Sequence, residues 1–301
     1  MPDSAALSRR DDRQRVMAVA ALLAGAVAIA TSALFVKVSE ARPVSTAFWR
    51  VSLALPFLWV WMLIDRRQTQ PAGRAPDRRL MVAAGLFFAG DLAVWHWSIV
   101  LTSVANATLL ANLAPIFVTL AAWLLFGKRP TLLFLAGLAA ALTGVMLLLG
   151  GDFSLGGRAL IGDALGVVTA VFYAGYQLTV TRLRGGASTA SIMAWSGLIT
   201  AAALLPVALL SGEQFFPDTG MGWVKLFGLA LIAQVAGQSL ITYAMAHLAA
   251  TFSSVGLLLQ PVMAAIFAWV LLGEAMGAVQ IAGGVMVLIG IRIAHHVEAA
   301  R

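Results

Sequence analysis

Ten apolar runs, each about as long as a membrane-crossing helix of roughly 20 residues, make up most of the chain. Charged residues lie in short clusters between the runs and account for only 11% of the 301 residues, against roughly 25% in a soluble domain. With 61% hydrophobic residues, a soluble core of this size could not bury the apolar surface. The runs are therefore predicted to be transmembrane helices, at residues 16–38, 44–64, 80–101, 104–126, 131–149, 160–181, 190–210, 223–246, 251–272 and 277–294.

The second half of the chain repeats the first. Residues 95–145 align without a gap with residues 241–291 at an offset of 146, which pairs Pro115 with Pro261. The alignment also pairs Trp123 with Trp269, Gly127 with Gly273, Gly137 with Gly283 and Gly144 with Gly290. Such a repeat is typical of a duplicated membrane unit. Because each half contains five spans, an odd number, the second copy must enter the bilayer inverted. The predicted fold is an all-α membrane protein of ten transmembrane helices, arranged as two inverted five-helix repeats.

Charge distribution predicts how the chain lies across the membrane. We expect a disordered cytoplasmic N-terminus at 1–15, a first five-helix repeat at 16–150, a periplasmic linker at 151–159, a second five-helix repeat at 160–294 and a cytoplasmic tail at 295–301. Of the 20 Lys and Arg residues, fifteen fall on the side of the two termini. Since cytoplasmic loops carry the excess of basic residues, we predict a multi-pass protein of the bacterial inner membrane with both termini in the cytoplasm.

Several classes of chemistry find no support in the sequence. The chain has no cysteine, which excludes disulfides and thiolate metal sites, and its four histidines lack metal-ligand spacing. No glycine-rich phosphate loop or nucleophile elbow is present. The net charge of +7 comes from Arg clusters that flank the spans and suit anionic lipid better than nucleic acid. We expect no cofactor, no metal and no nucleic acid partner, and we expect no enzyme activity.

One stretch of the second repeat resembles a known family. Residues 253–261 read Ser-Ser-Val-Gly-Leu-Leu-Leu-Gln-Pro, and residues 268–274 read Ala-Trp-Val-Leu-Leu-Gly-Glu. They resemble the closing half of bacterial drug/metabolite transporters of the EamA type, whose signature is Leu-Gly-Glu after an apolar span with a proline about a dozen residues earlier. The first repeat matches less strictly, because Lys128 follows its glycine. The resemblance implies a ten-helix secondary carrier, and many members export amino acids or other metabolites.

Asp91 is the most informative polar residue inside a span. It lies about 18 Å into a layer about 30 Å thick, where an ionised carboxylate costs roughly 2.5–3.5 kcal/mol. We therefore expect it to face a wet cavity or a partner, or to be protonated. Trp95 continues the same helical face. Asp91 is predicted to couple transport to protons or to bind a substrate ammonium, and the alternative is a structural carboxylate bonded to a neighbouring helix.

The remaining candidates lie in four other spans. Asn112 belongs to a polar stripe that ends at Pro115, and Pro261 occupies the inverted equivalent position. A proline removes one helical hydrogen bond, so these two are predicted to form a hinge pair, the alternative being tolerated kinks that shape packing. Aromatic and amide side chains that suit an amphipathic ligand, with ordinary interhelical hydrogen bonding as the alternative, are Tyr173, Tyr176, Gln177, Gln234 and Gln238.

Together these patterns predict a secondary transporter that exports amino acids or similar small metabolites by alternating access. Its partners would be a small-molecule substrate and the lipid bilayer, with protons as candidate coupling ions. A passive channel-like facilitator and an exporter of drugs or other metabolites are the alternatives. An intramembrane enzyme would need an acid/base or metal cluster, which the spacing does not provide. The sequence does not fix the oligomeric state, and a monomer is compatible with it.

Overall fold

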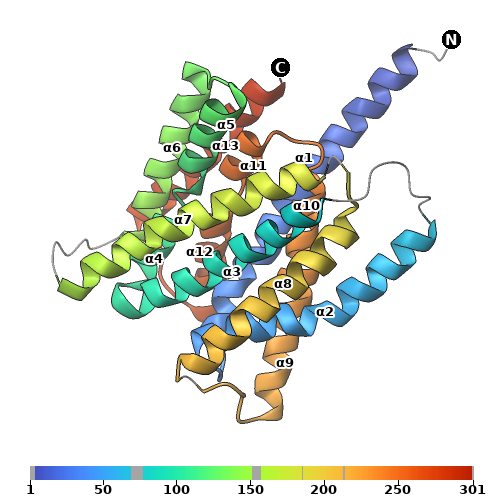
Figure 1. Ribbon diagram of the computed structural model, residues 1–301. Coiled ribbons are helices and arrows are strands. Elements are labelled where there is room, and N and C mark those ends of the chain that lie inside the picture. Colours follow the sequence, from blue (N-terminus) through green and yellow to red (C-terminus); the bar gives the residue numbers. More distant parts are fainter. Residues whose placement is uncertain (1–3, 69–76, 151–156, 185, 213, 300–301) are drawn as a thin grey trace.

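The computed structural model describes residues 4–68, 77–150, 157–184, 186–212 and 214–299, and within them the regular elements are all helical (Figure 1). The helices are α1 Ser4–Lys37, α2 Pro43–Gln68, α3 Arg78–Leu101, α4 Val104–Ala111, α5 Ala114–Phe126, α6 Leu132–Leu149, α7 Gly157–Leu183, α8 Thr189–Leu210, α9 Gly220–Leu229, η1 Ala230–Gly237, α10 Gln238–Ala244, α11 Ala250–Gly256, α12 Leu259–Leu272 and α13 Ala278–Ala299. The element η1 is a π-helix.

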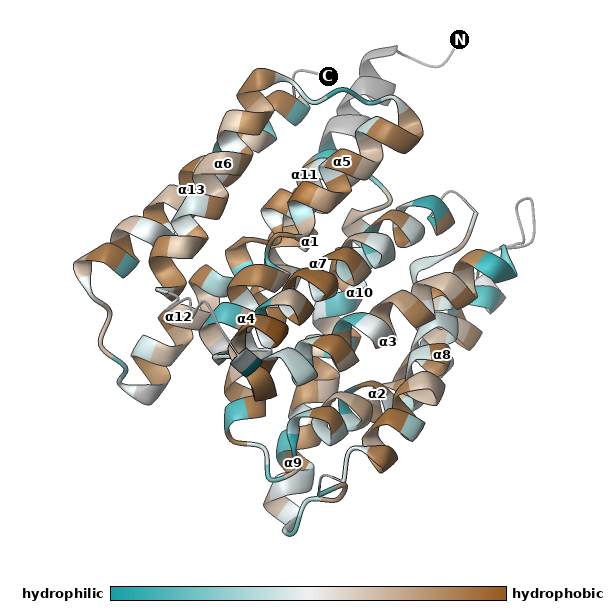
Figure 2. Ribbon diagram, turned by 60° about the vertical axis from the view of Figure 1, so that its left-hand side comes forward, coloured by the Kyte–Doolittle hydropathy of each residue, from teal (hydrophilic) through white to brown (hydrophobic). Residues whose placement is uncertain are grey.

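Ten stretches of the described chain are long and apolar enough to cross a membrane, as predicted. Three of them combine consecutive elements: α4 with α5, α9 and η1 with α10, and α11 with α12. Apolar side chains such as Leu132 and Leu210 are 86% and 85% exposed, which a soluble protein avoids but lipid requires. Hydrophobic residues dominate the helices, while hydrophilic residues gather mainly near their ends (Figure 2). The predicted fold class is confirmed.

Helix boundaries extend the repeat to the first two spans of each half. The ends of α1 and α7, at Lys37 and Leu183, differ by the same 146 residues as the starts of α2 and α8, at Pro43 and Thr189. The starts of α4 and α11, the ends of α5 and α12, and the starts of α6 and α13 obey the same offset. The first two spans of each half therefore share the repeat, although the sequence alignment begins only at residue 95.

The first helix of each repeat packs mainly against the other repeat. Among its substantial contacts, α1 packs against α9, η1, α10, α11 and α12, all in the second half. In the inverted arrangement, α7 packs mainly against α3, α4 and α5 of the first half. Two further pairs, α2 with α8 and α6 with α13, join equivalent helices across the repeats. The two halves are interlocked, so a site in the centre is built from both.

Local capping explains where many spans begin and end. The side chains of Ser103, Thr131, Ser188 and Thr219 accept hydrogen bonds from backbone N–H groups in the first turns of α4, α6, α8 and α9. Gly127 and Gly273 end α5 and α12 with positive φ angles of 66° and 70°. The repeated glycine after the tryptophan-containing helix is thus a left-handed C-cap in both copies, a conformation that favours glycine.

The chain termini differ from expectation. Residues 4–15 continue α1 as a helix instead of forming a disordered segment, because alanine and arginine are strong helix formers and the span provides a nucleus. The expected linker at 151–159 lies outside the described residues except for 157–159, which belong to α7. The expected tail at 295–301 continues α13 as far as Ala299. The described ends of α1 and α13 lie at the same end of the molecule (Figure 1).

Glycines allow α6 and α13 to touch backbone to backbone. A Cβ atom added at Gly144 would lie 2.6 Å from the carbonyl oxygen of Gly283, and one added at Gly290 would lie 2.5 Å from that of Gly137. These four residues are the glycines that the repeat alignment pairs. Close approach of small residues is a main source of helix association in membranes, where the hydrophobic effect between helices is absent.

Candidate functional site

The helix connections form two opposite faces. The latch face contains the connections α1–α2, α3–α4, α8–α9 and α12–α13. The basic face contains the connections α5–α6, α7–α8 and α10–α11, together with the described ends of α1 and α13. The candidate site lies between these faces, where two spans are interrupted.

The fourth and ninth spans are each broken near their middle. The break between α4 and α5 falls at Asn112 and Leu113, and the break between α11 and α12 falls at Leu257 and Leu258. Pro115 and Pro261 lie in the first turn of the second segment, where a proline costs no hydrogen bond. The breaks therefore lie before Pro115 and Pro261, the residues on which the hinge prediction was based. Asn112 donates a hydrogen bond through Nδ2 to the carbonyl oxygen of Thr108, 2.7 Å away, and its backbone N–H donates to the same oxygen at 3.0 Å.

A central cavity of about 20 Å³ lies between the two breaks and α7. It is lined by Ala111, Asn112, Ala114, Pro115, Tyr173, Gln177, Ser254, Leu257, Leu258 and Gln260. The amide oxygen of Gln177 and the amide nitrogen of Gln260 are buried without a hydrogen-bond partner in the described chain. A cavity of this volume can hold about one water molecule, which could serve such groups. The predicted residues Asn112, Pro115, Tyr173 and Gln177 are thus brought together.

A polar network lies next to this cavity and consists of Arg50, Asp91, Tyr176, Gln234 and Gln238. Arg50 Nε donates to Gln234 Oε1 at 3.1 Å, and Gln238 Nε2 donates to the hydroxyl of Tyr176 at 3.0 Å. Both glutamines are 1% exposed. They lie one turn apart where η1 passes into α10, and such π-helical turns are frequent at functional sites.

Asp91 lies on the same side of α3 as Phe88 and Ser98, which are buried. Its side chain is half-buried and interacts electrostatically with Arg50, Tyr173 and Tyr176. The rings of Tyr173 and Tyr176 are nearly parallel, at 12°, with centroids 6.3 Å apart. Tyr173 therefore connects the polar network to the central cavity.

Trp95 and Pro261 take different places from the other candidates. Trp95 follows Asp91 by one turn of α3, and its ring packs on that of His96 at a centroid distance of 4.9 Å. It belongs neither to the lining of the central cavity nor to the polar network among the described residues. Pro261 is buried just beyond Gln260, which lines the cavity, and not in the lining itself.

Sequence reasoning did not include Gln260, Ser254 and Arg50 among the site residues. Gln260 lies near Tyr173 and lines the cavity. In the repeat alignment Gln260 is opposite Ala114, so a departure from internal symmetry was the available signal. Arg50 could be placed at the site only through Gln234, from which it is separated by 184 positions.

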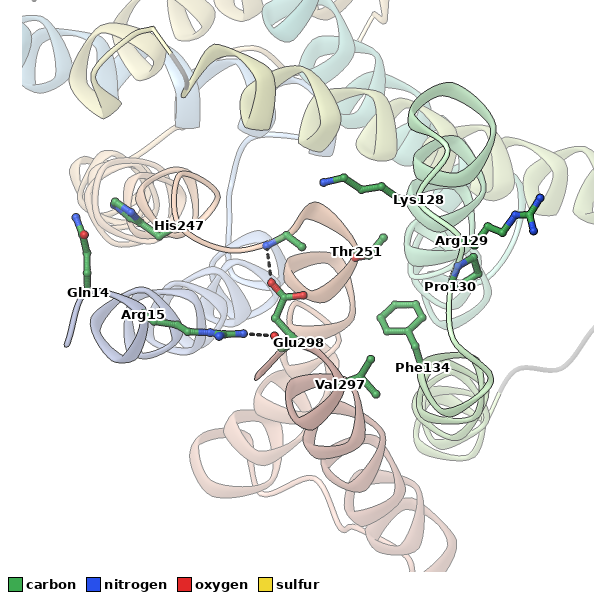
Figure 3. A pocket seen from close by; sticks show the side chains of 11 residues that line it. Gln14, Arg15, Lys128, Arg129, Pro130, Phe134, His247, Thr251, Val297 and Glu298 are labelled. Atoms are coloured by element: carbon green, nitrogen blue, oxygen red, sulfur yellow. Dashed lines mark hydrogen bonds between the residues drawn. The ribbon is translucent and has the colours of Figure 1, made fainter. Parts of the chain in front are cut away.

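A larger pocket of about 700 Å³ opens on the basic face (Figure 3). Its wall includes Lys128, Arg15 and Glu298, whose carboxylate accepts a hydrogen bond from the N–H of Ala249 at 3.1 Å. Lys128 reaches across the opening, whereas Arg129 points away from it (Figure 3). Thr251 lines this pocket and Ser254, three residues further along α11, lines the central cavity. Thus α11 runs from the pocket to the cavity.

His247 also lines the pocket on the basic face. Burial is the main cause that lowers the pKa of His247, and the nearby Arg184 guanidinium lowers it further. Since its ordinary pKa is already about 6.5, the imidazole is mostly neutral at pH 7. The positive charge of the pocket at this pH therefore comes from its lysine and arginine side chains.

The latch face is closed by an aromatic plug of Phe48, Trp49, Phe215, Phe216 and Trp223. The ring centroids of the other four lie 4.9–5.7 Å from that of Trp49. The indole Nε1 of Trp49 donates to the carbonyl oxygen of Phe215 at 2.7 Å. Trp49 of the plug and Arg50 of the polar network are consecutive residues of α2.

Two acidic side chains connect loops across the latch face. Glu40 accepts hydrogen bonds from the backbone N–H and the hydroxyl of Thr219, at 2.9 and 2.7 Å, with Lys225 Nζ 3.9 Å away. Glu274 forms an ion pair with Lys37 at the end of α1. Each contact joins one repeat to the other, so the latch face is closed by interactions between the repeats.

The profile of the EamA-like transporter family matches residues 16–150 and 160–294. A solved crystal structure is similar over 96% of this chain and 98% of its own, with a TM-score of 0.77 and 18% sequence identity. At that identity the likeness concerns the fold.

Curated relatives are all described as transporters or exporters. An "uncharacterized transporter" of Archaeoglobus fulgidus is 27% identical over 273 residues, 87% of this chain and 91% of that protein. The pseudopaline exporter CntI of Pseudomonas aeruginosa is 27% identical over 222 residues, 72% of this chain and 76% of the exporter. A protein of Streptantibioticus cattleyicolor described as a "probable terminal-alkyne amino-acid exporter" is 28% identical over 200 residues, 66% of each chain.

Proposed function

This chain belongs to the EamA-like transporter family, and we propose that it exports amino acids or similar small metabolites across the bacterial inner membrane by alternating access. The multi-pass fold and the transporter family do not specify the direction of transport or the substrate. The proposal therefore rests on the site. The observation that carries it is the polar network of Arg50, Asp91, Tyr176, Gln234 and Gln238 beside a cavity at two broken helices. Charged groups at this depth are costly, and in membrane proteins they commonly mark substrate or ion pathways.

The basic face is proposed to be cytoplasmic. It carries the excess of Lys and Arg residues counted in the sequence, which marks the cytoplasmic side of short-looped membrane proteins. The pocket of about 700 Å³ then opens to the cytoplasm, and the aromatic plug closes the periplasmic side. A substrate would enter from the pocket along α11 and reach Tyr173, which separates the central cavity from Asp91.

The substrate is proposed to contact Asp91, Asn112, Tyr173, Tyr176, Gln177, Gln234 and Gln238. Gln177 and Gln260 have unmet hydrogen-bonding atoms that a substrate or water could satisfy. Discontinuous helices at the interface of inverted repeats form the substrate sites of many secondary transporters. The interruptions before Pro115 and Pro261 are accordingly proposed as the hinges about which the helix segments move.

Transport by purified protein in proteoliposomes tests the proposal. Efflux of a panel of amino acids, other small metabolites and drugs would be measured with and without a pH gradient. We expect saturable flux and counterflow of at least one amino acid or related metabolite, and a pH gradient that changes its accumulation would indicate proton coupling. Flux that rises linearly with concentration without counterflow would favour a channel, and no flux of any compound would contradict the proposal.

Replacing Glu40 with glutamine is expected to open the latch face more often. Glutamine keeps the size of the side chain but loses the charge that strengthens the hydrogen bonds from Thr219 and attracts Lys225. Because the chain has no cysteine, spin labels can be attached at Arg42→Cys and Met221→Cys, one on each side of the contact. Pulsed electron paramagnetic resonance should show a larger population of long distances in Glu40→Gln.

Acidification should act through the same carboxylate. The hydrogen bonds from Thr219, and to a smaller extent Lys225, lower the pKa of Glu40 in the closed latch. A carboxylate with a lowered pKa stabilises the closed state above its pKa in the open state, and that stabilisation is lost as the pH falls through the lowered pKa. The spin-label distances should therefore lengthen below the usual titration range of glutamate, but not in Glu40→Gln. Equal distances above and below this titration range in the unsubstituted protein would show that Glu40 does not hold the latch face closed.

A further inference from the structure

Asp91 has no bonding partner in the described chain. It accepts no hydrogen bond, and no Lys, Arg or His nitrogen lies within 4.0 Å of its carboxylate. Its oxygens are also not among the described side-chain atoms that are both fully buried and without a hydrogen-bond partner. They therefore border accessible space. Asp91 interacts electrostatically with Arg50 of α2 and with Tyr173 and Tyr176 of α7, so its side chain lies on the side of α3 that approaches these helices. A carboxylate held open in this way is suited to a cationic group from outside the chain.

The guanidinium of Arg50 also has polar atoms without a partner in the described chain. Its Nε donates to the buried amide of Gln234, which fixes the plane of the guanidinium. The two terminal nitrogens have no acceptor in the described chain, and they too are not among the fully buried atoms without a partner. This outer edge of the guanidinium matches the two oxygens of a carboxylate, which it can bind with two parallel hydrogen bonds.

The charges of Arg50 and Asp91 interact without forming an ion pair. Each feels the charge of the other, yet they lie further apart than the 4.0 Å of an ion pair. Gln234 holds Arg50, and the bonded pair of Gln238 and Tyr176 forms an adjacent wall. The aromatic ring of Phe88 stacks on Tyr176 at 4.8 Å, which adds an apolar surface beside the charges.

From this arrangement we infer that the site binds zwitterions that carry an amino-acid group, with the ammonium on Asp91 and the carboxylate on Arg50. The inference rests on the proposed function and specifies its substrate class. A zwitterion adds no net charge to a site that already contains one cation and one anion. An amine or an acid alone would satisfy one group and leave an uncompensated charge inside the membrane, which is costly.

Calorimetric binding to the purified protein tests the inference with matched ligand triads. Each triad contains an amino acid, its decarboxylated amine and its deaminated acid, for example phenylalanine, phenethylamine and 3-phenylpropanoate, with equivalent sets for glycine and leucine. At least one amino acid should bind about tenfold or more tightly than either of its analogues, because each analogue loses a charged hydrogen bond. If no amino acid binds, or if an analogue binds equally well, the inference is wrong.

Substitutions should separate the two ends of the ligand. Asp91→Asn should weaken the amino acid and the amine about tenfold without weakening the acid, and Arg50→Gln should weaken the amino acid and the acid without weakening the amine. Arg50→Lys, which keeps the charge but loses the planar edge, should give an intermediate loss of acid binding. Asp163→Asn and Arg158→Gln make the same chemical changes on another helix, α7. They should leave the affinities for all three ligands unchanged.

Uniform loss of all three ligands in both charge variants would show that the residues support the fold and do not bind the two ends. Flux measurements keep this outcome apart from failure of the proposed function. Export restricted to amines, acids or uncharged metabolites would overturn the inference and leave export itself intact. An absence of export with the expected binding pattern would overturn the proposed function and support the inference.

Discussion

Gly283→Ala is expected to destabilise the folded protein by about 1–3 kcal/mol, the usual cost of forcing an extra carbon into a well-packed contact. The new Cβ would lie 2.6 Å from the carbonyl oxygen of Gly144 and 2.7 Å from the N–H nitrogen of Leu148. Both atoms belong to the backbone of α6, so no side-chain rotation can relieve the overlap. The two helices must separate, and contacts along the whole α6–α13 pair are lost.

Gly284→Ala provides a matched control on the same helix. A Cβ at Gly284 would have its closest neighbour, a methyl group of Val262, at 3.7 Å, which is an ordinary contact. Both substitutions gain the same helix propensity, about 1 kcal/mol per residue. Thermal unfolding in detergent should therefore show a lower Tm for Gly283→Ala and an equal or higher Tm for Gly284→Ala. Equal Tm values for the two variants would contradict a backbone contact between α6 and α13.

Asp91→Asn is expected to lower the kcat/KM of export by about 10- to 100-fold, the loss of a hydrogen bond between charged groups. Asparagine has the same shape, and the carboxylate of Asp91 forms no bond in the described chain that the fold would lose. The folded protein should therefore be retained, with an unchanged elution volume and Tm. Asp163→Asn is the control, because this carboxylate accepts a hydrogen bond from Thr102 near the latch face.

Gln238→Leu tests the same site from the opposite repeat. Leucine fills a similar volume but leaves the hydroxyl of buried Tyr176 without its partner at 3.0 Å, so that only the nearby Thr242 can serve it. We expect a smaller loss of export than for Asp91→Asn, with Tm lowered by the cost of a partly satisfied buried hydroxyl, about 1 kcal/mol. Unchanged export by both Asp91→Asn and Gln238→Leu would exclude the polar network as the substrate site.

Local properties of the sequence were sufficient for the overall architecture. Span length and hydropathy identified ten crossings, and an odd number in each repeat required inversion. Proline chemistry predicted a hinge pair in the fourth and ninth spans, and the helices of both spans are interrupted two to four residues before Pro115 and Pro261. The helical segment at 4–15 was missed because its polar composition indicated disorder, whereas its helix-forming residues extend α1.

The candidate site could be foreseen only in part. Asn112, Tyr173 and Gln177 were predicted from polarity and spacing, and they line one cavity. Trp95 shares a helical face with Asp91 but packs on His96, since spacing along one helix does not specify what lies opposite. Arg50 and Gln260 acquired their place from partners on other helices, which no pattern within their own spans encodes.

The sequence by itself determined the membrane-spanning class, the ten helices, their inverted duplication and the family, because hydropathy, span length and motif spacing are carried by neighbouring residues. Only the tertiary structure decided that α1 and α7 exchange places between the repeats, that the repeated glycines meet across α6 and α13, and that Arg50 and Asp91 remain unpaired. These features depend on contacts between segments far apart in the chain. Packing geometry selects such contacts, and no local pattern records them.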